Sequence, residues 1–333
     1  MKRVLLVLLA LLIFSVSLIS LLAGGAAGRG IFSPWGGRGS LRPSQSSAPR
    51  QAAAEVGSVL PATELSGSNR TVAQTTRALL RIPILMYHRI GEPADGLTVT
   101  PKDFAQQMRF LAEQGYRTIT LSQLLQEMAA LTGSRDARSL AEAGDSSQPR
   151  EPSLLAGKVV VLTFDDGYDS VFLQAFPVLK KYHFTATVFP ITGLVGKKGF
   201  LNWDEMKEMA DYGVDVGSHT VHHPDLRYLR KGELEQEIED SRQILLRRLG
   251  QSVRAFCYPA GKYNPQVLEE VRRAGYLGAV TTEYGAVTLS DDPYRLRRIR
   301  IDGRENGKVF AAKLLREEPK AVVNGREDYG VLR

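Results

Sequence analysis

The stretch KVVVLTFDDGYDSVFLQAFPVLKKYHFTATVFPI, residues 158–191, sets the pattern for the folded part of the chain. Its apolar run at 158–164 predicts a buried strand, residues 170–182 predict a helix, and residues 185–191 predict a second strand. The same patterns predict further strands at 82–88, 117–121, 214–219, 254–259, 276–282 and 295–301, and further helices at 100–116, 122–128, 203–213, 233–250, 265–275 and 307–317. Because helical crossovers join parallel strands, this alternation predicts an α/β fold, either a barrel or an open sheet.

Length and composition are those of an ordinary globular protein. Of the 333 residues, 43% are hydrophobic and 24% are charged, and the formal net charge is +7. A basic surface suits anionic lipid or wall polymer. No motif interleaves aromatic and basic residues, so we expect no nucleic-acid binding. The single cysteine, Cys257, excludes an intramolecular disulfide and a cysteine-rich metal site.

The N-terminus predicts export. MKR is followed by VLLVLLALLIFSVSLISLL and then by AGGAAG, which together give the basic start, apolar run and small residues of a secretory signal. The apolar run approaches the roughly 20 residues needed to span a bilayer. Residues 1–27 are therefore either a cleaved signal peptide or a retained membrane anchor, and we expect the protein at the cell surface or secreted.

Composition divides the rest of the chain. Residues 28–80 are rich in Gly, Ser, Ala, Pro and Arg and predict a disordered linker. Residues 81–320 carry the strand–helix pattern and form the predicted catalytic domain. Within it, residues 132–156 break the pattern and predict a surface insertion, and residues 321–333 form a C-terminal tail.

Polar side chains follow four of the predicted strands, in the segments LMYHRI, TFDDG, GSHTVHHPD and FCYPAGKYN. In α/β barrels the chemistry gathers at the carboxyl ends of the strands. No G-x-G-x-x-G or Walker-type loop is present, which argues against a nucleotide-binding open sheet.

The aspartate pair and the histidine run predict a metal site. His219 and His223 are four residues apart, and on a helical turn this spacing places both imidazoles on one side. Asp166 offers a third, oxygen ligand, and two histidines with a carboxylate leave open positions, as in catalytic zinc sites. The alternative is a solvent-exposed, histidine-rich turn. We expect His222 to point elsewhere.

Two further residues predict proton transfer. Beside a cation, Asp165 stays ionised and can take a proton from water; the alternative is a cap of the following turn. Gly167 allows a sharp turn that aims both carboxylates at one cavity. His88 ends a strand and is the candidate acid, the alternative being a hydrogen-bonded histidine at a pocket rim. His183 ends a predicted helix and fits a structural role.

Two motifs resemble the polysaccharide deacetylases of carbohydrate esterase family four. T-F-D-D-G stands at 163–167, and H-[ST]-x-x-H-P stands as HTVHHP at 219–224. The resemblance spans about residues 82–302 and implies a distorted (β/α) barrel of about seven parallel strands. It also implies metal-dependent removal of N-acetyl groups from an N-acetylglucosamine polymer. The implied base is Asp165, and the implied ligands of a divalent metal, usually Zn²⁺, are Asp166, His219 and His223.

The third family motif, usually R-x-P-Y-G, departs from that pattern. Here CYPAG puts Cys257 in place of the arginine that steadies the base, and Ala260 in place of the tyrosine. Arg298 and Lys262 are the two candidates to replace that arginine. A backbone N–H near Ala260 can still hold an oxyanion. The expected substrate or oxyanion residues are Tyr258, Pro259, Ala260 and Arg298.

No histidine follows His223, although the family usually has a late one. The early LMYHRI, residues 85–90, instead resembles the subgroup that deacetylates poly-β-1,6-N-acetylglucosamine, in which an early histidine takes the acid role. This resemblance points to His88. Other readings remain open: a peptidoglycan or chitin-oligomer deacetylase, an amidase for a small non-sugar amide, and a catalytically weak, sugar-binding barrel.

Overall fold

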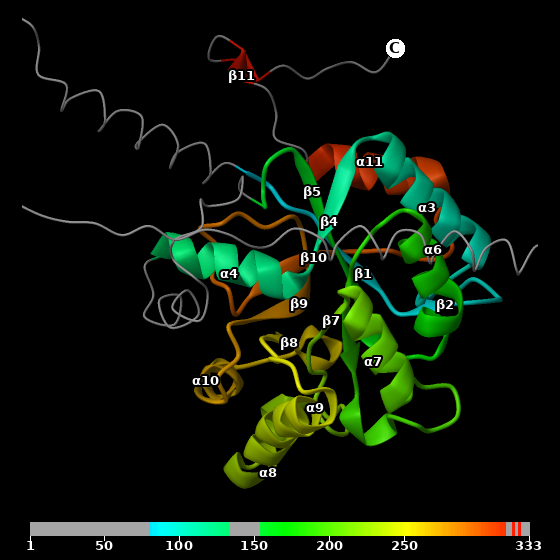
Figure 1. Ribbon diagram of the computed structural model, residues 1–333. Coiled ribbons are helices and arrows are strands. Elements are labelled where there is room, and N and C mark those ends of the chain that lie inside the picture. Colours follow the sequence, from blue (N-terminus) through cyan, green and yellow to red (C-terminus); the bar gives the residue numbers. More distant parts are fainter. Residues whose placement is uncertain (1–79, 133–153, 318–321, 324–325, 328–333) are drawn as a thin grey trace, which may run out of the picture. The chain divides into compact units, whose positions relative to one another are not determined.

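The computed structural model describes residues 80–132, 154–317, 322–323 and 326–327 (Figure 1). All of them belong to the second of two units of the chain, Leu60–Arg333. The expected signal or anchor at 1–27, nearly all of the linker and most of the insertion lie outside the described residues. Among the helices described, none is both long enough and apolar enough to span a bilayer.

The centre of the domain is a ring of parallel strands. In order around the sheet these are β7 (Asp215–Val216), β6 (Thr187–Pro190), β5 (Lys158–Asp166), β1 (Ile84–Tyr87), β10 (Leu296–Arg300), β9 (Gly278–Tyr284) and β8 (Ala255–Cys257). An eighth strand, β4 (Tyr116–Ile119), pairs with the first half of β5 outside this order.

Ser218 nearly closes the ring between β7 and β8. Its N–H donates to the carbonyl oxygen of Ala255 at 3.0 Å, and its own carbonyl accepts from the N–H of Cys257 at 2.9 Å. The expected distorted barrel of about seven parallel strands is therefore confirmed. The distortion lies at this seam, where β7 has two residues and β8 has three.

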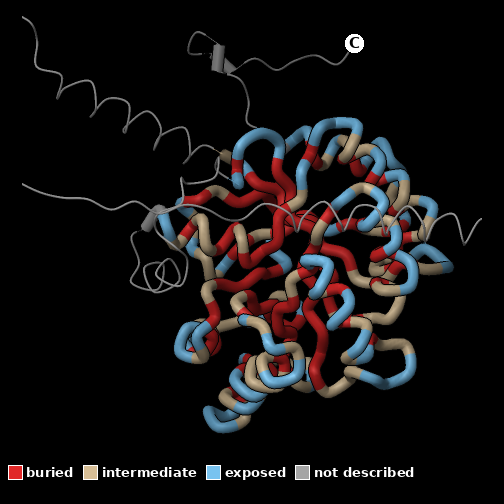
Figure 2. Tube along the Cα trace, viewed as in Figure 1, coloured by how far each residue is buried: buried red, intermediate tan, exposed pale blue. Residues whose placement is uncertain are grey.

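Side-chain alternation separates the interior of the barrel from its helix-covered outside. In β5, Val160, Leu162 and Phe164 belong to the core cluster that includes residues of the surrounding helices. Val159 and Val161 belong to a second cluster that joins residues from β1, β5, β6, β8, β9 and β10 across the interior. Figure 2 shows the strands as a continuous buried centre.

The helices surround the strands (Figure 1). They are α3 (Pro101–Glu113), α4 (Leu121–Thr132), α6 (Phe176–Lys181), α7 (Trp203–Tyr212), α8 (Lys231–Glu235), α9 (Ser241–Leu249), α10 (Pro265–Arg273) and α11 (Gly307–Glu317). Local chemistry sets their ends as expected. Thr100 caps α3 by accepting from the N–H of Asp103 at 3.0 Å, and Gly213 ends α7 with a left-handed φ of 112°.

Three details differ from the sequence prediction. The predicted helix 170–182 begins with a π-helical turn, Val171–Ala175, and the predicted helix 233–250 contains another, Gln236–Asp240. A small parallel pair, β2 (Arg89–Ile90) with β3 (Thr98–Val99), follows β1. The predicted tail contains β11 (Val322–Val323) paired with β12 (Arg326–Glu327). A π-helical turn spans only one turn within a longer helix, which is too short for the apolar period to mark it.

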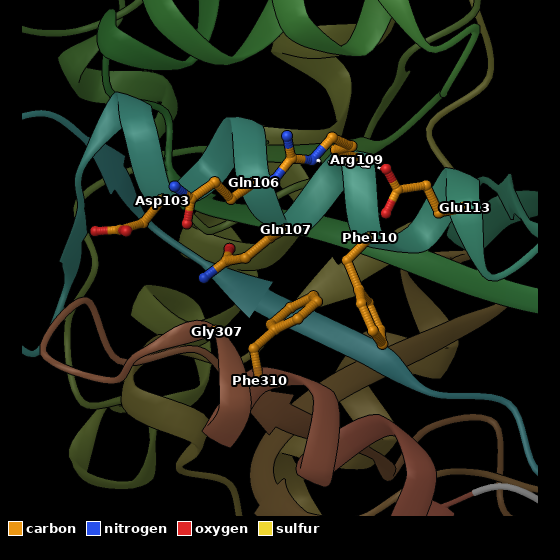
Figure 3. Close-up of a pocket in the computed structure, with 8 residues that line it drawn as sticks. All are labelled: Asp103, Gln106, Gln107, Arg109, Phe110, Glu113, Gly307 and Phe310. Carbon is orange, nitrogen blue, oxygen red and sulfur yellow. Dashed lines mark ion pairs between the residues drawn. The ribbon is translucent and has the colours of Figure 1, made fainter.

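The last helix packs on the first one described. Phe110 of α3 and Phe310 of α11 meet edge to face with ring centroids 5.9 Å apart. A cavity of about 230 Å³ lies beside this pair (Figure 3). Gln107 lines that cavity and also accepts a hydrogen bond from the buried hydroxyl of Tyr87 at 2.9 Å. Helix α3 therefore contacts both α11 and β1, the strand that leads to His88.

A substitution at Gly217, beside the seam between β7 and β8, tests how tightly the barrel is packed there. A Cβ at this position would overlap the ring of Phe189 and lie 2.8 Å from the carbonyl oxygen of Ala255. We expect Gly217→Ala to lower the free energy of unfolding by about 1–3 kcal/mol, the usual cost of overpacking. The matched control is Gly232→Ala in α8, whose Cβ meets no atom within 4 Å. Urea unfolding measures both variants, and equal stability of Gly217→Ala and wild type would contradict this account of the seam.

Candidate active site

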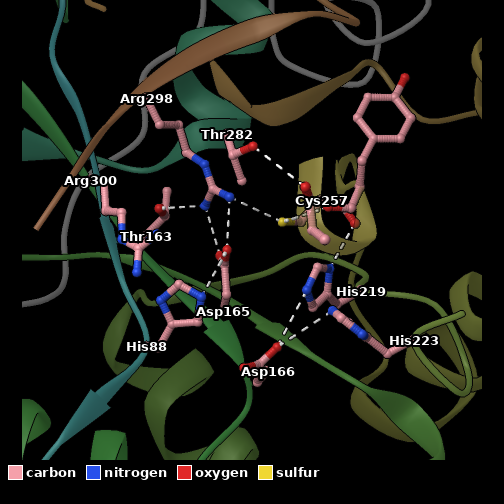
Figure 4. Close-up of polar contacts among 12 residues, drawn as sticks. His88, Thr163, Asp165, Asp166, His219, His223, Cys257, Thr282, Arg298 and Arg300 are labelled. Carbon is pink, nitrogen blue, oxygen red and sulfur yellow. Dashed lines mark hydrogen bonds and ion pairs between the residues drawn. The ribbon is translucent and has the colours of Figure 1, made fainter. Parts of the chain in front are cut away.

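The functional side chains project from the carboxyl ends of the barrel strands (Figure 4). Asp165 and Asp166 end β5, His88 directly follows β1, and His219 follows Ser218 at the seam. By the alternation along β5, Thr163 and Asp165 share the inner face with Val161. Parallel strands and helical crossovers thus bring residues that are far apart in sequence to one end of the barrel.

A buried ion pair holds Asp165. The guanidinium of Arg298 donates from Nη1 and Nη2 to the two carboxylate oxygens of Asp165, each at 2.7 Å. The side chains of Arg298 and Asp165 are 0% and 4% exposed. Burial alone would raise the pKa of Asp165, but the charge and hydrogen bonds of Arg298 hold that pKa well below its usual range. Asp165 is therefore ionised at neutral pH.

Arg298 is itself fixed by three other contacts. Its Nε donates to the carbonyl oxygen of Thr281 at 2.8 Å, and Nη1 donates to the hydroxyl of Thr163 at 3.1 Å. Its Nη2 lies 3.4 Å from the sulfur of Cys257. The sequence prediction missed Thr163 and Thr281 in this role. For Thr163 the available signal is a polar residue on the inner, otherwise apolar face of a strand, whereas Thr281 contacts Arg298 through its backbone carbonyl, which no side-chain pattern reveals.

This pair decides between the two candidates for the missing arginine. Arg298 reaches Asp165 from β10, whereas Lys262 lies 3.2 Å from Asp225 and makes a different ion pair. Cys257, at the family's arginine position, lies on the same inner face and contacts the guanidinium through sulfur. Arg298 thus fills the position beside Asp165 from another strand.

Asp166, His219 and His223 form a second group. The Nε2 atoms of His219 and His223 lie 3.4 and 3.8 Å from Oδ1 of Asp166. The Nδ1 of His219 is 2.7 Å from the carbonyl oxygen of Cys257, and because a carbonyl only accepts, Nδ1 carries the proton. This leaves the lone pair of Nε2 directed at the cluster. Two imidazoles and a carboxylate with one tautomer fixed suit a divalent cation.

An overlapping group of Asp165, His219 and Cys257 also has its ligand atoms within 4.8 Å of one another. It suits a cation less well. Both oxygens of Asp165 accept from Arg298. Burial raises the pKa of the Cys257 thiol, and only a thiolate is a good ligand.

The four-residue spacing of the histidines predicted a helical turn. That prediction is wrong, because the loop that carries them is not helical. The rings of His219 and His223 meet with centroids 4.6 Å apart because Thr220 and His223 adopt left-handed backbone conformations, with φ of 69° and 61°. The hydroxyl of Thr220 accepts from the N–H of His223 at 2.8 Å. A tight turn therefore brings the rings together.

His222 points away from the cluster, as expected. Its Nδ1 lies 2.7 Å from Oε1 of Glu237, and its side chain is 73% exposed. By contrast, the ring of His88 points toward Asp165, with its Nε2 4.0 Å from Oδ2 of that residue. Burial lowers the pKa of His88, although the charges of Asp165 and Asp166 act in the opposite direction.

The expected substrate residues after β8 are only partly brought to the site. Tyr258 lies on the outer face, where it is buried and its hydroxyl donates to the carbonyl oxygen of Tyr294 at 3.1 Å. Its side chain was therefore wrongly assigned to the substrate, because strand alternation turns it away from Cys257. Pro259 is buried, while Ala260 is exposed with a left-handed φ of 52°.

Gly167 shows why the aspartate pair is followed by glycine. Its φ is 78°, and a Cβ would lie 2.7 Å from the Cα of Pro190. Both a left-handed conformation and close contact with β6 exclude a side chain here. The expected sharp turn after the carboxylates is present.

Comparison with known proteins agrees with the motifs. The family model described as polysaccharide deacetylase matches residues 155–279. The Bacillus subtilis protein YxkH, which carries polysaccharide deacetylase as a provisional name, is 35% identical over 232 residues, which are 70% of this chain and 75% of YxkH. The chain belongs to the polysaccharide deacetylase family.

Named deacetylases are found among both the sequence relatives and the solved structures that resemble this chain. The Staphylococcus epidermidis poly-β-1,6-N-acetyl-D-glucosamine N-deacetylase is 27% identical over 221 residues, covering 61% of this chain and 68% of that protein. Among solved structures, the Streptococcus pyogenes deacetylase PplD, in complex with acetate, has 32% identity and a TM-score of 0.59, and the match covers 72% of this chain and 98% of PplD. IcaB from Ammonifex degensii has 29% identity and a TM-score of 0.53, covering 71% and 97%.

The neighbouring histidines provide a matched test of the metal site. His223→Ala removes a ligand atom from the cluster, so we expect the affinity of the deacetylase for Zn²⁺ to fall by more than about 100-fold. His222→Ala removes an exposed imidazole outside the cluster but keeps the backbone N–H groups of residues 221 and 222 that donate to Glu237, so we expect its affinity for Zn²⁺ to stay within a few-fold of wild type. Metal content after dialysis and chelator competition measure both. Loss of Zn²⁺ from the His222 variant alone would reverse the assignment.

Proposed function

We propose that this deacetylase removes N-acetyl groups from an exported N-acetylglucosamine polymer, poly-β-1,6-N-acetylglucosamine. The observation that carries the proposal is the position of His88, which comes from the end of β1 and faces Asp165 across 4.0 Å. An early histidine is the mark of the subgroup with this substrate. The Staphylococcus relatives bear that activity in their names, at 27–31% identity.

Asp165 is the base in this proposal. Arg298 keeps its carboxylate ionised, and the same carboxylate has an oxygen within 4.8 Å of a ring nitrogen of His219. A water placed between Asp165 and the Asp166–His219–His223 cluster is therefore within reach of the base. Arg298 positions Asp165 and keeps it ionised until it takes the proton from water, and it leaves the second lone pair of each oxygen for that water.

A divalent cation, with Zn²⁺ best suited to two imidazoles and a carboxylate, would be held by Asp166, His219 and His223. When bound, it would acidify water and polarise the acetyl carbonyl. Asp166 supplies the negative charge of that site, and His219 is oriented by the carbonyl oxygen of Cys257.

His88 is the acid. Hydrolysis of an amide must protonate the leaving sugar nitrogen. The imidazole of His88 can supply this proton, because its Nε2 lies 4.0 Å from Oδ2 of Asp165 and His88 is not among the residues whose ligand atoms gather at the metal cluster. Burial lowers the pKa of His88, and the carboxylates of Asp165 and Asp166 offset part of that decrease. The backbone N–H of Ala260, an exposed residue in the turn after β8, is the proposed donor to the oxyanion.

The surroundings suit a polymer. A cavity of about 400 Å³ adjoins the cluster through Arg89, which follows His88, and Tyr168, which follows the aspartate pair. Tyr168 lines the cavity, and burial and the nearby carboxylate of Asp166 raise its pKa, so Tyr168 lies close to both the cavity and the cluster. Charged side chains of both signs line it, including Asp95 and Lys198, and these can hydrogen-bond a neighbouring sugar unit. The predicted signal or anchor at 1–27 would place the reaction at the cell surface.

A panel of defined oligomers tests the substrate. We expect acetate release from β-1,6-linked N-acetylglucosamine oligomers to exceed release from β-1,4-linked ones of equal length, to stop on chelation and to return with Zn²⁺. Preference for the β-1,4 series would assign chitin or peptidoglycan. Binding without release would identify a sugar-binding barrel, and release only from small non-sugar amides would identify an amidase.

Asp165→Asn tests the base. We expect acetate release to fall by about 100-fold or more while Zn²⁺ is retained. We also expect a loss of about 3–5 kcal/mol in the free energy of unfolding, because the amide leaves the charge of Arg298 buried without a counter-ion. The control is Asp204→Asn, an exposed aspartate in the first turn of α7. Undiminished release by the Asp165 variant would refute its role as base.

His88→Ala tests the acid. We expect kcat to fall by about 10²–10⁴-fold, with loss of the basic limb of the pH–rate profile. The sign follows from the role, since activity that needs the imidazolium declines as the pH rises through the pKa of His88. His183→Asn is the control, because His183 is exposed, has a left-handed φ of 55° that Asn tolerates, and lies beyond α6. An unchanged profile in the His88 variant would return this residue to a structural role.

A further inference from the structure

The loop between the two histidines of the cluster needs support from outside itself. Thr220 and His223 both have left-handed backbone conformations, which cost residues other than glycine on the order of 1–3 kcal/mol each. Such conformations persist only where surrounding contacts enforce them. The contacts that do so come from the helical segment that runs through α8, the π-helical turn Gln236–Asp240 and α9.

Glu237, in the π-helical turn, holds the middle of the loop. Its Oε2 accepts from the backbone N–H groups of Val221 and His222, at 2.9 and 2.8 Å. Its Oε1 lies 2.7 Å from Nδ1 of His222, and its side chain is only 12% exposed. One carboxylate thus satisfies three polar groups of the loop, and two of them are backbone groups between the histidines.

Ser241, the first residue of α9, holds the start of the loop through a directional chain of hydrogen bonds. Its hydroxyl donates to the carbonyl oxygen of Ile238 at 2.9 Å, so it must accept from the hydroxyl of Ser218 at 2.7 Å. The oxygen of Ser218 in turn accepts from the N–H of Thr220 at 3.2 Å. Ser218 and Ser241 are fully buried, so these bonds have no competition from water.

The two contacts come from one element. Glu237 and Ser241 are four residues apart across the π-helical turn, and both face the segment 218–222. π-Helical turns inside α-helices occur frequently at functional sites. Neither residue is among those whose ligand atoms gather at the cluster. Their effect on a cation therefore passes through the positions of His219 and His223.

We propose that Glu237 and Ser241 form a brace that pre-organises His219 and His223 for a divalent cation and thereby sets the affinity of the site. The inference rests on the proposed metal site. The brace affects the affinity for the cation and not the chemical step. A bound cation would itself hold the two histidines in place. Among the contacts described, neither Asp165 nor His88 touches Glu237 or Ser241.

The test is the affinity of the purified protein for Zn²⁺, measured by competition with a chelator. We expect Glu237→Ala to bind about 10–100-fold more weakly than wild type, the usual effect of losing a partner that orients a metal ligand. Glu237→Gln keeps an oxygen that can accept from the two backbone N–H groups, and we expect it to recover most of the affinity. Glu239→Ala, an exposed carboxylate in the same π-helical turn, is the matched control and should bind as wild type does.

Activity separates positioning from a general loss of structure. At saturating Zn²⁺ we expect the kcat of Glu237→Ala to return to within a few-fold of wild type, with the defect confined to the Zn²⁺ concentration required. Ser241→Ala should shift affinity in the same direction and carries the test if Glu237→Ala does not fold. Wild-type affinity in Glu237→Ala, or in Ser241→Ala if Glu237→Ala does not fold, would overturn the brace alone. Failure of the wild-type protein to bind Zn²⁺ would overturn the metal site, and the brace with it.

Discussion

A carboxylate buried inside a barrel stays ionised when a buried cation pairs with it and donates hydrogen bonds to it, and Arg298 does both for Asp165. The pair is bidentate, and the arginine is 0% exposed. Breaking such a pair by removing one partner typically costs about 3–5 kcal/mol. The need to hold both charges in register explains why Thr163, Thr281 and Cys257 converge on the guanidinium from three different strands.

The same constraint separates the two aspartates of the motif. Asp165 points inward to Arg298, and Asp166, with a left-handed φ of 71°, turns toward His219 and His223. Gly167 makes this divergence possible because no Cβ fits against Pro190. The repulsion between adjacent carboxylates is thus relieved by turning one toward a fixed guanidinium and the other toward a cluster of imidazoles.

The active site keeps two of the family's motifs and compensates for the change in the third. The deacetylase keeps the two motifs that supply the aspartates and the paired histidines, and it departs from the family where CYPAG replaces R-x-P-Y-G. A barrel tolerates that departure because every strand directs alternate side chains into the interior, so a residue from another strand can take the same place. The guanidinium that one strand end lacks at Cys257 comes instead from β10, two positions along the ring from β8.

The sequence by itself determined the alternating elements, the α/β class, the helix caps and the residues that meet at the strand ends, because apolar period, capping side chains and motif spacing are local properties. The barrel was predicted by the resemblance of the two motifs to the family. Only the tertiary structure decided that Arg298 and not Lys262 pairs with Asp165, that Tyr258 faces outward, and that a tight turn joins the histidines. It also revealed Glu237, which no pattern marks. These outcomes depend on which strands become neighbours and on which face a side chain lies, and contacts between residues more than a hundred positions apart, such as Thr163 and Arg298, leave no periodic trace in the sequence.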